Sequence, residues 1–512
     1  MKLPTNDPKL LTEGLYKTDI FNLNPMFAVQ LQNKQQLSYV RSWEEAFAIH
    51  GEAYISDINP AYVASLITNV QTNTSSPYKR IKRLPRANFI KILRNGDFKA
   101  YPYEPFGGGV SSQKERELHN IIDYIFQNKL KNAIPQGENR IGCELSSGLD
   151  SNAIVGGLIK GLDIDPRNIF TWSHDGNGEE SYIKEFQTFH KLNTENTHIN
   201  KTEYKKENFQ ESLKENLFIF GMPHQLGGNT ECIKFFKKCS CKILFSGFGG
   251  DQAISHNGHN LATDLIKNFE FIEFFQWMDN PLKALKTMLG RTYGLINNDW
   301  QESKFSKKVS HMKKNNLLIS LLTEKGKDWL IPHLSKEFIA EIDTYSTLHN
   351  SIRQRCMSQW VSVRLEEEVR LAAKYGIRKY FPLLDETLLG TLLNQDPKYF
   401  AEKYLQGRLI HRKSFAKYLP EKLRLDPSKY RDINNQWTAF EREKQAKVLN
   451  DLIEFSQQWN QHLSKFWQLD ELKKYAINTQ INIKKINIHE SSKVIKAMRT
   501  VNKLSCWFSE LE

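Results

Sequence analysis

The sequence has few cysteines, and they are spread widely over its 512 residues. They occupy positions 143, 232, 239, 241, 356 and 506. Such scattered thiols do not form the dense framework of a small disulfide-rich protein. The CxC pair at 239 and 241 lacks a second pair at the spacing of a zinc site. We therefore expect ordinary reduced thiols.

Long hydrophobic runs are also missing. The longest apolar stretches, such as NNLLISLL at 315–322, are far too short to cross a bilayer. No amino-terminal segment joins a basic region to an apolar run as a signal peptide does. We expect a soluble, cytoplasmic protein without a membrane partner. Its composition, 40% hydrophobic and 25% charged, is that of a globular chain long enough for two or more domains.

The chain carries a formal net charge of +13 and has a pI near 9.1. This excess suits an anionic partner such as nucleic acid, nucleotide phosphates or an acidic peptide. The basic residues gather in three separate clusters, at 78–86, 304–314 and 481–499. Because lysine-rich sequences commonly form solvated faces of this kind, the clusters do not indicate a nucleic-acid groove.

A glycine-rich seam, YEPFGGGVSS at 103–112, divides the sequence. Its proline, three glycines and two serines predict a flexible connection. The segments FIKIL and FKAYPY before it are strand-like. We therefore predict one domain at 1–110 and a second domain at 113–512.

Helical and strand-like patterns alternate after the seam. Apolar residues within 113–130 have the spacing of one buried helix face. The elements predicted next are a strand at 140–145, a helix at 151–162, a strand at 168–176, a helix at 181–192, a strand at 196–200, a helix at 231–239 and a strand at 242–246. This alternation predicts an α/β fold with a doubly wound parallel sheet covered by helices on both faces.

The stretch LSSGLDS at 145–151 follows a predicted strand and opens a predicted helix. In a doubly wound sheet, such a loop presents backbone N–H groups and the positive end of a helix to phosphate oxygens. The residues expected to bind phosphate are Ser146, Ser147, Gly148 and Ser151. Asp150 would repel phosphates unless a cation lay between them, so it predicts Mg²⁺.

A second loop of similar composition, SGFGGDQ, follows the strand at 242–246. Gly247, after Ser246, would let this loop approach a nucleotide, and Asp251 would supply a second carboxylate to the same Mg²⁺. Two such loops in one α/β pattern are much more specific than either alone. Neither loop is a Walker loop, and the glycine-rich FGGGVSS at 106–112 also lacks the GK[ST] ending.

The two loops carry a family resemblance. LSSGLDS at 145–151 resembles the SGGxDS pyrophosphate-binding signature of the ATP pyrophosphatases, and LFSGFGGDQ at 244–252 is similar to the SGxGxDE turn of the asparagine synthetase branch. Residues 380–393 and 407–432 resemble later segments of that branch, and 81–105 resembles the end of its glutaminase domain.

This resemblance implies a sheet of the adenine nucleotide alpha hydrolase-like type and a ligase that uses ATP and Mg²⁺ to adenylate a carboxylate. It also implies that adenine lies near Trp172 and Ser173. Ser147 and Gln252 depart from the usual glycine and glutamate of the two motifs. These departures keep open a scaffold without catalytic activity.

Other departures bear on the source of the amine. A working glutaminase of this family needs a cysteine directly after the initiator methionine, but Lys2 stands there and no cysteine precedes Cys143. The resemblance therefore implies a degenerate glutaminase-like domain and an amine supplied by the substrate. Where β-lactam-forming relatives carry a tyrosine, this chain has Phe248. The sequence is most similar to the lasso peptide cyclases, or macrolactam synthetases, of the microcin J25 type.

The same resemblance implies roles for two further residues. Lys429, with Lys422 as the weaker match, would stabilise the charge that develops during amide formation. Glu366, with Glu367 and Glu368 as alternatives, would accept a proton from the amine. The implied partners are a precursor peptide and the leader peptidase that frees its amino terminus, in a complex with the chain.

Three alternatives remain open at the level of sequence. The chain is a β-lactam or other small-molecule amide synthetase, a tRNA-modifying ATP pyrophosphatase, or a scaffold without catalytic activity. The aromatic stretch at 268–282 either lines a peptide cavity or packs as a core helix, and its composition favours the core.

Overall fold

The computed structural model describes most of the chain. It covers residues 9–21, 23, 25–30, 37–68, 76–107, 109, 114–175, 180–201, 230–278, 280–296, 316–333, 346–402, 406–425 and 434–512. Lys2 and Lys429 therefore lie outside the described residues.

A five-stranded sheet forms the centre of the α/β part, in the order β11-β10-β7-β8-β9. Every neighbouring pair is parallel. The strands are β7 (Ile141–Glu144), β8 (Ile169–Asp175), β9 (Thr197–Lys201), β10 (Ile243–Phe245) and β11 (Arg378–Tyr380). The predicted α/β class and parallel sheet are confirmed. The sequence analysis did not anticipate β11, a strand of three residues.

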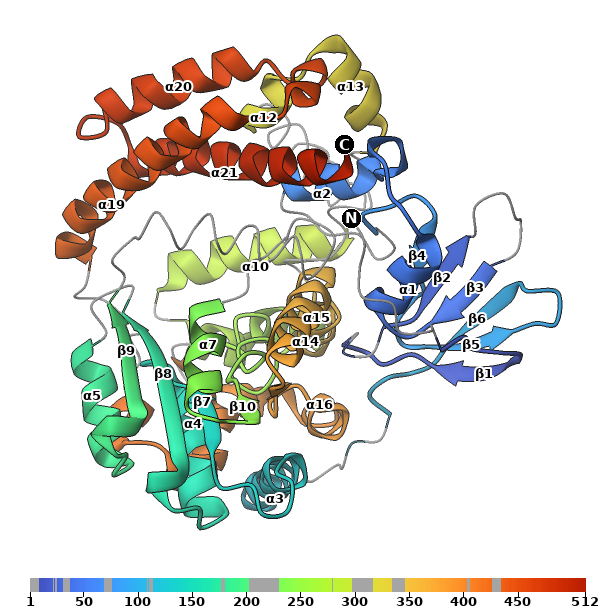
Figure 1. The fold of residues 1–512 in the computed structure, drawn as a ribbon. Coiled ribbons are helices and arrows are strands. Elements are labelled where there is room, and N and C mark those ends of the chain that lie inside the picture. Colours follow the sequence, from blue (N-terminus) through green and yellow to red (C-terminus); the bar gives the residue numbers. More distant parts are fainter. Residues whose placement is uncertain are drawn as a thin grey trace.

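Helices cover both faces of this sheet, as side chains that alternate along each strand require. Leu244 packs in one core, whereas Ile243 and Phe245 pack in the other. The helices are α3 (Glu115–Ala133), α4 (Leu149–Gly156), α5 (Glu180–Phe189), α7 (Thr230–Lys238) and α15 (Gln359–Lys374). Those predicted at 113–130, 151–162, 181–192 and 231–239 correspond to the first four. Figure 1 shows α4 and α7 beside the strands.

The amino-terminal region contains two antiparallel sheets of three strands, ordered β1-β5-β6 and β3-β2-β4. The elements are β1 (Gly14–Lys17), β2 (Phe27–Gln30), β3 (Leu37–Val40), α1 (Trp43–His50), α2 (Pro60–Thr68), β4 (Ile81–Arg83), β5 (Asn88–Ile92) and β6 (Phe98–Pro102). The strand-like segments FIKIL and FKAYPY are thus strands. Met26, Ala28, Ile90 and Ile92 are buried together.

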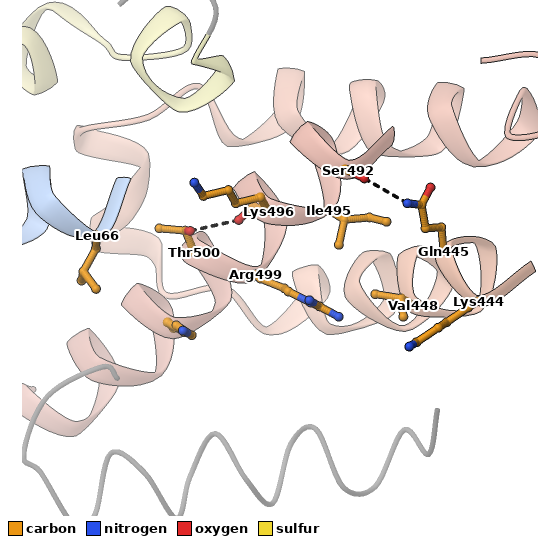
Figure 2. A pocket seen from close by; sticks show the side chains of 10 residues that line it. Leu66, Lys444, Gln445, Val448, Ser492, Ile495, Lys496, Arg499 and Thr500 are labelled. Atoms are coloured by element: carbon orange, nitrogen blue, oxygen red, sulfur yellow. Dashed lines mark hydrogen bonds between the residues drawn. The ribbon is translucent and has the colours of Figure 1, made fainter. Parts of the chain in front are cut away.

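Three long helices close the chain and pack on the amino-terminal region (Figure 1). They are α19 (Asn434–Phe455), α20 (Leu469–Ile481) and α21 (Ile488–Leu511). Trp507 of α21 donates to the hydroxyl of Tyr78 at 3.1 Å. Gln445 of α19 donates to Ser492 of α21 at 3.0 Å (Figure 2). One hydrophobic core thus joins residues near both ends of the chain.

Within the glycine-rich seam, Gly109 lies against α16 (Glu386–Leu393). Asn394 donates its amide to the carbonyl of Gly109 at 3.1 Å, and a Cβ at Gly109 would overlap the backbone of Gly390. This part of the seam is therefore packed. The boundary between domains at 1–110 and 113–512 stays a prediction.

The remaining helices connect these layers. They are α8 (Leu261–Lys267), α9 (Phe271–Trp277), α10 (Pro281–Ile296), α12 (Leu317–Ser320), α13 (Glu324–Leu330), α14 (Leu348–Cys356), α17 (Leu409–Ser414) and α18 (Glu421–Leu425), with a short hairpin of β12 (Ala401–Glu402) and β13 (Gln406–Gly407). Within the described ranges, no helix is both long and apolar enough to span a membrane.

Candidate active site

The two loops predicted to bind the nucleotide, at 145–151 and 246–252, meet at the same edge of the sheet. β7 and β10 are parallel neighbours, so the loops that follow them leave side by side. Gly247 makes the approach possible, because a Cβ there would lie 2.7 Å from the backbone nitrogen of Ser151. A side chain at position 247 would force the loops apart.

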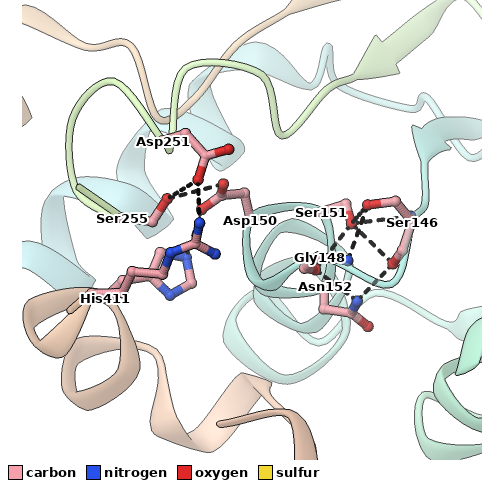
Figure 3. Close-up of polar contacts among 9 residues, drawn as sticks. Ser146, Gly148, Asp150, Ser151, Asn152, Asp251, Ser255 and His411 are labelled. Carbon is pink, nitrogen blue, oxygen red and sulfur yellow. Dashed lines mark hydrogen bonds and ion pairs between the residues drawn. The ribbon is translucent and has the colours of Figure 1, made fainter. Parts of the chain in front are cut away.

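The first loop is held in shape by its own hydroxyl groups (Figure 3). Ser151 Oγ lies 3.0 Å from Ser146 Oγ and accepts from Ser146 N at 3.1 Å. The backbone N–H of Gly148 donates to Ser146 Oγ at 3.1 Å. Asn152 donates to the carbonyls of Ser146 and Gly148 at 3.0 and 2.9 Å. The loop is thus preorganised where α4 begins.

The carboxylates of Asp150 and Asp251 converge on one hydroxyl group (Figure 3). Ser255 Oγ donates to Asp150 Oδ2 at 3.0 Å and lies 3.4 Å from Asp251 Oδ1. Gly250 leaves room for the first carboxylate, because a Cβ at that position would overlap its carbon and both oxygens. The structure therefore brings together the two acids that sequence analysis assigned to one metal.

Two basic residues from the segment 407–432 also lie close to these acids. His411 of α17 is fully buried, and its Nε2 lies 3.1 Å from Asp150 Oδ1. Arg408 places a guanidinium nitrogen 2.9 Å from Asp251 Oδ1. Arg408 also has a left-handed backbone, with φ of 71°, a conformation that non-glycine residues rarely adopt. Such rare backbone conformations often accompany functional sites.

The donor set fits Mg²⁺ in the form that nucleotide enzymes use. In such sites, one or two carboxylates and the substrate's phosphate oxygens share the ion with water. Asp150 and Asp251 supply the carboxylates, and their common contact with Ser255 holds them close together. No group of three or more His, Cys, Asp or Glu suited to a metal occurs in the described part of the chain. The phosphates of ATP would therefore have to complete the coordination.

The other residues predicted to face the nucleotide lie at the same edge or just inside it. Ser147, Ser173 and Ser246 are buried, whereas Ser146 is exposed. Ser246 directly follows β10, and its Oγ accepts from the backbone of Phe248 at 3.3 Å. Ser173 belongs to β8, and the carbonyl of Trp172 accepts from Leu145 N at 3.0 Å. Their contact with a nucleotide stays a prediction.

Glu366 and Glu368, two of the three glutamates of α15, have different surroundings. Glu366 is 3% exposed, and its Oε2 lies 3.0 Å from a guanidinium nitrogen of Arg83. Its other oxygen accepts from Trp43 Nε1. The carboxylate of Glu366 thus lies among residues of the amino-terminal region. Its role as the general base stays a prediction, and this placement gives that role no support.

Glu368 instead joins a buried network beside the strand ends. Lys379 of β11 lies 2.7 Å from Glu368 Oε2 and 2.5 Å from Glu144 Oε1, at the end of β7. Arg364 pairs with Glu368 at 2.7 Å and lies over the ring of Phe248, 4.2 Å from its centroid. This network links α15 to the second loop. Glu368 therefore positions Arg364 rather than acting as a free carboxylate.

Removing the cation of this network is expected to destabilise the protein. Lys379→Met leaves the carboxylates of Glu144 and Glu368 without their shared partner, so we expect a loss of about 3–5 kcal/mol in the free energy of unfolding. Urea denaturation at pH 7 measures this loss. Lys374→Met, on the exposed end of α15, is the matched control and should change stability little. Equal stability in both variants would contradict the proposed importance of the network.

The same network predicts a pH dependence. Burial opposes ionisation of Glu368, but the charges of Lys379 and Arg364 outweigh it and lower the pKa of its carboxyl to about 2, from an ordinary 4.5. A lowered folded-state pKa stabilises the fold above the unfolded-state pKa. The stability lost in Glu368→Gln should therefore be largest above pH 4.5 and shrink toward pH 2. Denaturation of both proteins across this range tests the prediction, and a pH-independent difference would oppose it.

Of the two candidate lysines in the segment 407–432, only Lys422 belongs to the described residues. Lys429 is outside the described residues. Lys422 of α18 lies 3.0 Å from Glu185 Oε2, and both side chains are exposed. Lys422 thus has an ion-pair partner on α5, the helix that follows β8.

The fold and the converging loops define an ATP-binding α/β domain of the pyrophosphatase class. The sequence profile of the asparagine synthase family matches residues 125–473, more than half of the chain. The chain therefore belongs to the asparagine synthase family. This membership implies ATP-dependent adenylation and amide formation. No curated protein matches the chain significantly.

Sequence reasoning missed Ser255, Arg408 and His411. Arg408 and His411 lie in RLIHRKS at 408–414. This segment matches no motif that would mark an arginine or a histidine as part of a nucleotide site. Ser255 follows Asp251 by four residues, but residues 251–255 form turns rather than a helix, so their spacing carried no signal.

Proposed function

We propose that the chain is an AMP-forming peptide cyclase that closes a macrolactam in lasso peptide maturation. It would join an Asp or Glu side chain of a leaderless precursor to the peptide's own amino terminus. The observation that carries the ATP-dependent step is the convergence of Asp150 and Asp251 on Ser255, beside the loop at 146–151.

The chemistry follows from the poor reactivity of a carboxylate toward an amine. A carboxylate oxygen of the peptide attacks the α-phosphorus of ATP, and the bond to pyrophosphate breaks. The N–H and hydroxyl groups of residues 146–151 are positioned to hold the departing pyrophosphate. Mg²⁺, when bound by Asp150 and Asp251, would neutralise charge on the phosphates.

Amide formation completes the reaction. The peptide's amino group, after losing a proton, attacks the acyl carbon, the bond to AMP breaks, and a C–N bond forms. An amino terminus has a pKa near ~7.7–8.0 and is largely protonated at neutral pH, so the step depends on deprotonation. Holding the two ends of one peptide together supplies much of the remaining rate.

The absence of a route to ammonia favours a substrate that supplies its own amino group. No cysteine precedes Cys143, so the amino-terminal region in this sequence has no thiol with which to release ammonia from glutamine. Phe248 cannot exchange a proton, and its ring is occupied by Arg364 and lies 5.7 Å from that of Trp360. A tyrosine-dependent small-molecule mechanism is therefore less well supported than ring closure within a peptide.

An exposed apolar surface on α9 and α10 supports a large substrate. Phe274 is buried, but Ile272 is 78% and Leu282 79% exposed. The other exposed members are Phe271 and Phe275 on α9, Leu285, Leu289 and Tyr293 on α10, and Phe269 just before α9. The expectation of a core helix at 268–282 is therefore wrong for most of its apolar side chains. Exposed apolar side chains gathered on two neighbouring helices are typical of interaction sites.

One of these two helices, α10, is joined to the segment between the second loop and α8, and to α8 itself. Arg291 of α10 donates to the carbonyl of His259 at 3.2 Å and to the hydroxyl of Thr263. α10 is thus anchored to the segment that follows the second loop. The proposed partners are the precursor peptide and its leader peptidase, acting as a complex with the chain.

Mass spectrometry of peptide products tests the proposed function. Leaderless peptides with an acidic residue several positions from a free amino terminus are incubated with the chain, its peptidase and Mg-ATP. Loss of one water together with AMP and pyrophosphate is the expected result. AMP without ring closure would exclude these peptides as substrates and direct the test to small amino acids. Neither product would oppose the cyclase.

The role proposed for Lys429 separates the two half-reactions. Lys429→Ala should still form AMP but lower the amide formed per AMP by about 100- to 1000-fold, because charge on the acyl oxygen and phosphate loses its cation. Lys422→Ala, whose lysine pairs with Glu185, is the matched control and should retain amide formation. Counting AMP and cyclic product in parallel measures the effect. If Lys422→Ala, and not Lys429→Ala, loses amide formation, the stabilising cation is Lys422.

A further inference from the structure

Arg408 is held beside the second loop by its backbone. Its N–H donates to the carbonyl of His256 at 3.2 Å, and a Cβ at the preceding Gly407 would lie 2.1 Å from the carbonyl oxygen of Asn257. The chain here thus packs directly on the segment that follows the second loop. From this place the guanidinium reaches Asp251 Oδ1 at 2.9 Å, and the arginine side chain is only 20% exposed. Packing of the backbone therefore fixes where this cation lies.

The local structure at position 408 gives no reason for an arginine. With φ of 71°, Arg408 adopts the left-handed conformation, which glycine enters without the steric cost that a Cβ brings. The residue also stands directly before α17, where Ser, Thr, Asp, Asn or Gly is usual, and its side chain makes no capping hydrogen bond there. The value of an arginine at this position therefore lies in what its guanidinium does beside Asp251.

The guanidinium places a positive charge where the proposed metal ion would bind. Asp150 and Asp251 both contact Ser255 and supply the negative charge of the site (Figure 3). Arg408 offsets the charge of one of them and repels a divalent cation at short range. The phosphates of a nucleotide change this balance, because their negative charge attracts the metal ion and the guanidinium alike.

A guanidinium can contact the carboxylate and the phosphates together. It carries five N–H donors in a planar fork, so a group that donates to Asp251 retains donors for phosphate oxygens. Phosphates that share Mg²⁺ with Asp251 would lie next to that carboxylate, within reach of Arg408. We propose that Arg408 is a specificity-determining residue of the nucleotide site. It weakens the binding of a bare divalent cation and strengthens the binding of a cation held by a triphosphate. This inference rests on the proposed ATP-dependent function and adds to it the selection of metal-bound nucleotide.

Two binding measurements on the full chain test this role without catalysis. Mn²⁺ alone is followed by the electron paramagnetic resonance signal of the free ion, and Mn²⁺-ATP by equilibrium dialysis of labelled ATP without peptide. Arg408→Met should bind Mn²⁺ alone about 10-fold more tightly, because a like charge is removed. It should bind Mn²⁺-ATP about 10- to 100-fold more weakly, because a charged hydrogen-bond partner is lost. The same titration of Asp251→Ala corrects for Mn²⁺ bound elsewhere.

Three further variants separate the charge from the fold. Arg408→Gly removes the side chain from a backbone that glycine adopts readily, so it should melt close to the wild-type temperature and bind as Arg408→Met does. Arg408→Lys keeps the charge but loses the planar fork, so Mn²⁺ alone should bind as in the wild type and Mn²⁺-ATP more weakly. Arg167→Met removes an exposed arginine that pairs with Asp165 just before β8, and it should match the wild type in both measurements.

Opposite changes in the two affinities are the expected result. A fall in both would show that Arg408 only holds the loops in place, and a rise in both would show that it only competes with the metal. Unchanged affinities would exclude it from the site. Each of these three outcomes overturns the inference while the wild type still binds Mn²⁺-ATP. A wild-type protein that binds no Mn²⁺-ATP would overturn the proposed function itself, and the inference with it.

Discussion

Replacing Asp251 with alanine is expected to lower AMP formation by about a thousandfold or more, which corresponds to losing several kcal/mol of charge stabilisation. The side chain is 55% exposed, so its loss should leave the fold intact. Asp251 converges with Asp150 on Ser255, and one acid alone would hold Mg²⁺ and the triphosphate poorly. The variant should therefore fold but fail at adenylation, the step before the peptide's amine attacks.

Exchange of labelled pyrophosphate into ATP in the presence of peptide measures this first step directly. Glu273→Gln is the matched control, because it removes from α9 an exposed carboxylate that pairs with Lys398. Its exchange rate should be that of the wild type. An active Asp251→Ala protein would refute the shared metal site.

Adding a single methyl group at Gly250 is expected to have the second largest effect. A Cβ at this position would overlap the carboxylate of Asp150, which is held by Ser255 and His411. The carboxylate or the second loop must then move. We expect Gly250→Ala to lower AMP formation by about 100-fold, as small displacements of positioned groups do. Overpacking should also lower the free energy of unfolding by about 1–3 kcal/mol.

Gly290→Ala provides the matched control for that substitution. Gly290 lies within α10, and a Cβ there would meet nothing within 4 Å. Alanine is the better helix former by about 1 kcal/mol, so this variant should be unchanged or more stable. Urea denaturation and pyrophosphate exchange are measured for both. Similar behaviour of the two variants would show that the space beside Asp150 is not needed.

The sequence was sufficient for the α/β core because its signals are local. Helical spacing within 113–130 and short apolar strands before each loop are set by side-chain burial on alternating faces. Both loops were likewise visible, since small residues and a carboxylate after a strand have a direct physical reason. β11 was not anticipated, because three residues are too few to show a period.

The acidic helix shows where local reasoning ends. Glu366, Glu367 and Glu368 are consecutive, and successive residues on a helix point in different directions. Glu366 lies by Arg83, whereas Glu368 lies by Lys379. The partners lie far apart in the chain, so no pattern within the helix indicates which carboxylate faces which neighbour.

The sequence by itself determined the class of fold and the two loops, each with its carboxylate, because each loop consists of residues close together in the chain. The tertiary structure alone decided that Ser255, Arg408 and His411 meet those carboxylates. These contacts depend on how distant helices and strands pack, and packing is fixed only when the whole chain has buried its apolar surface.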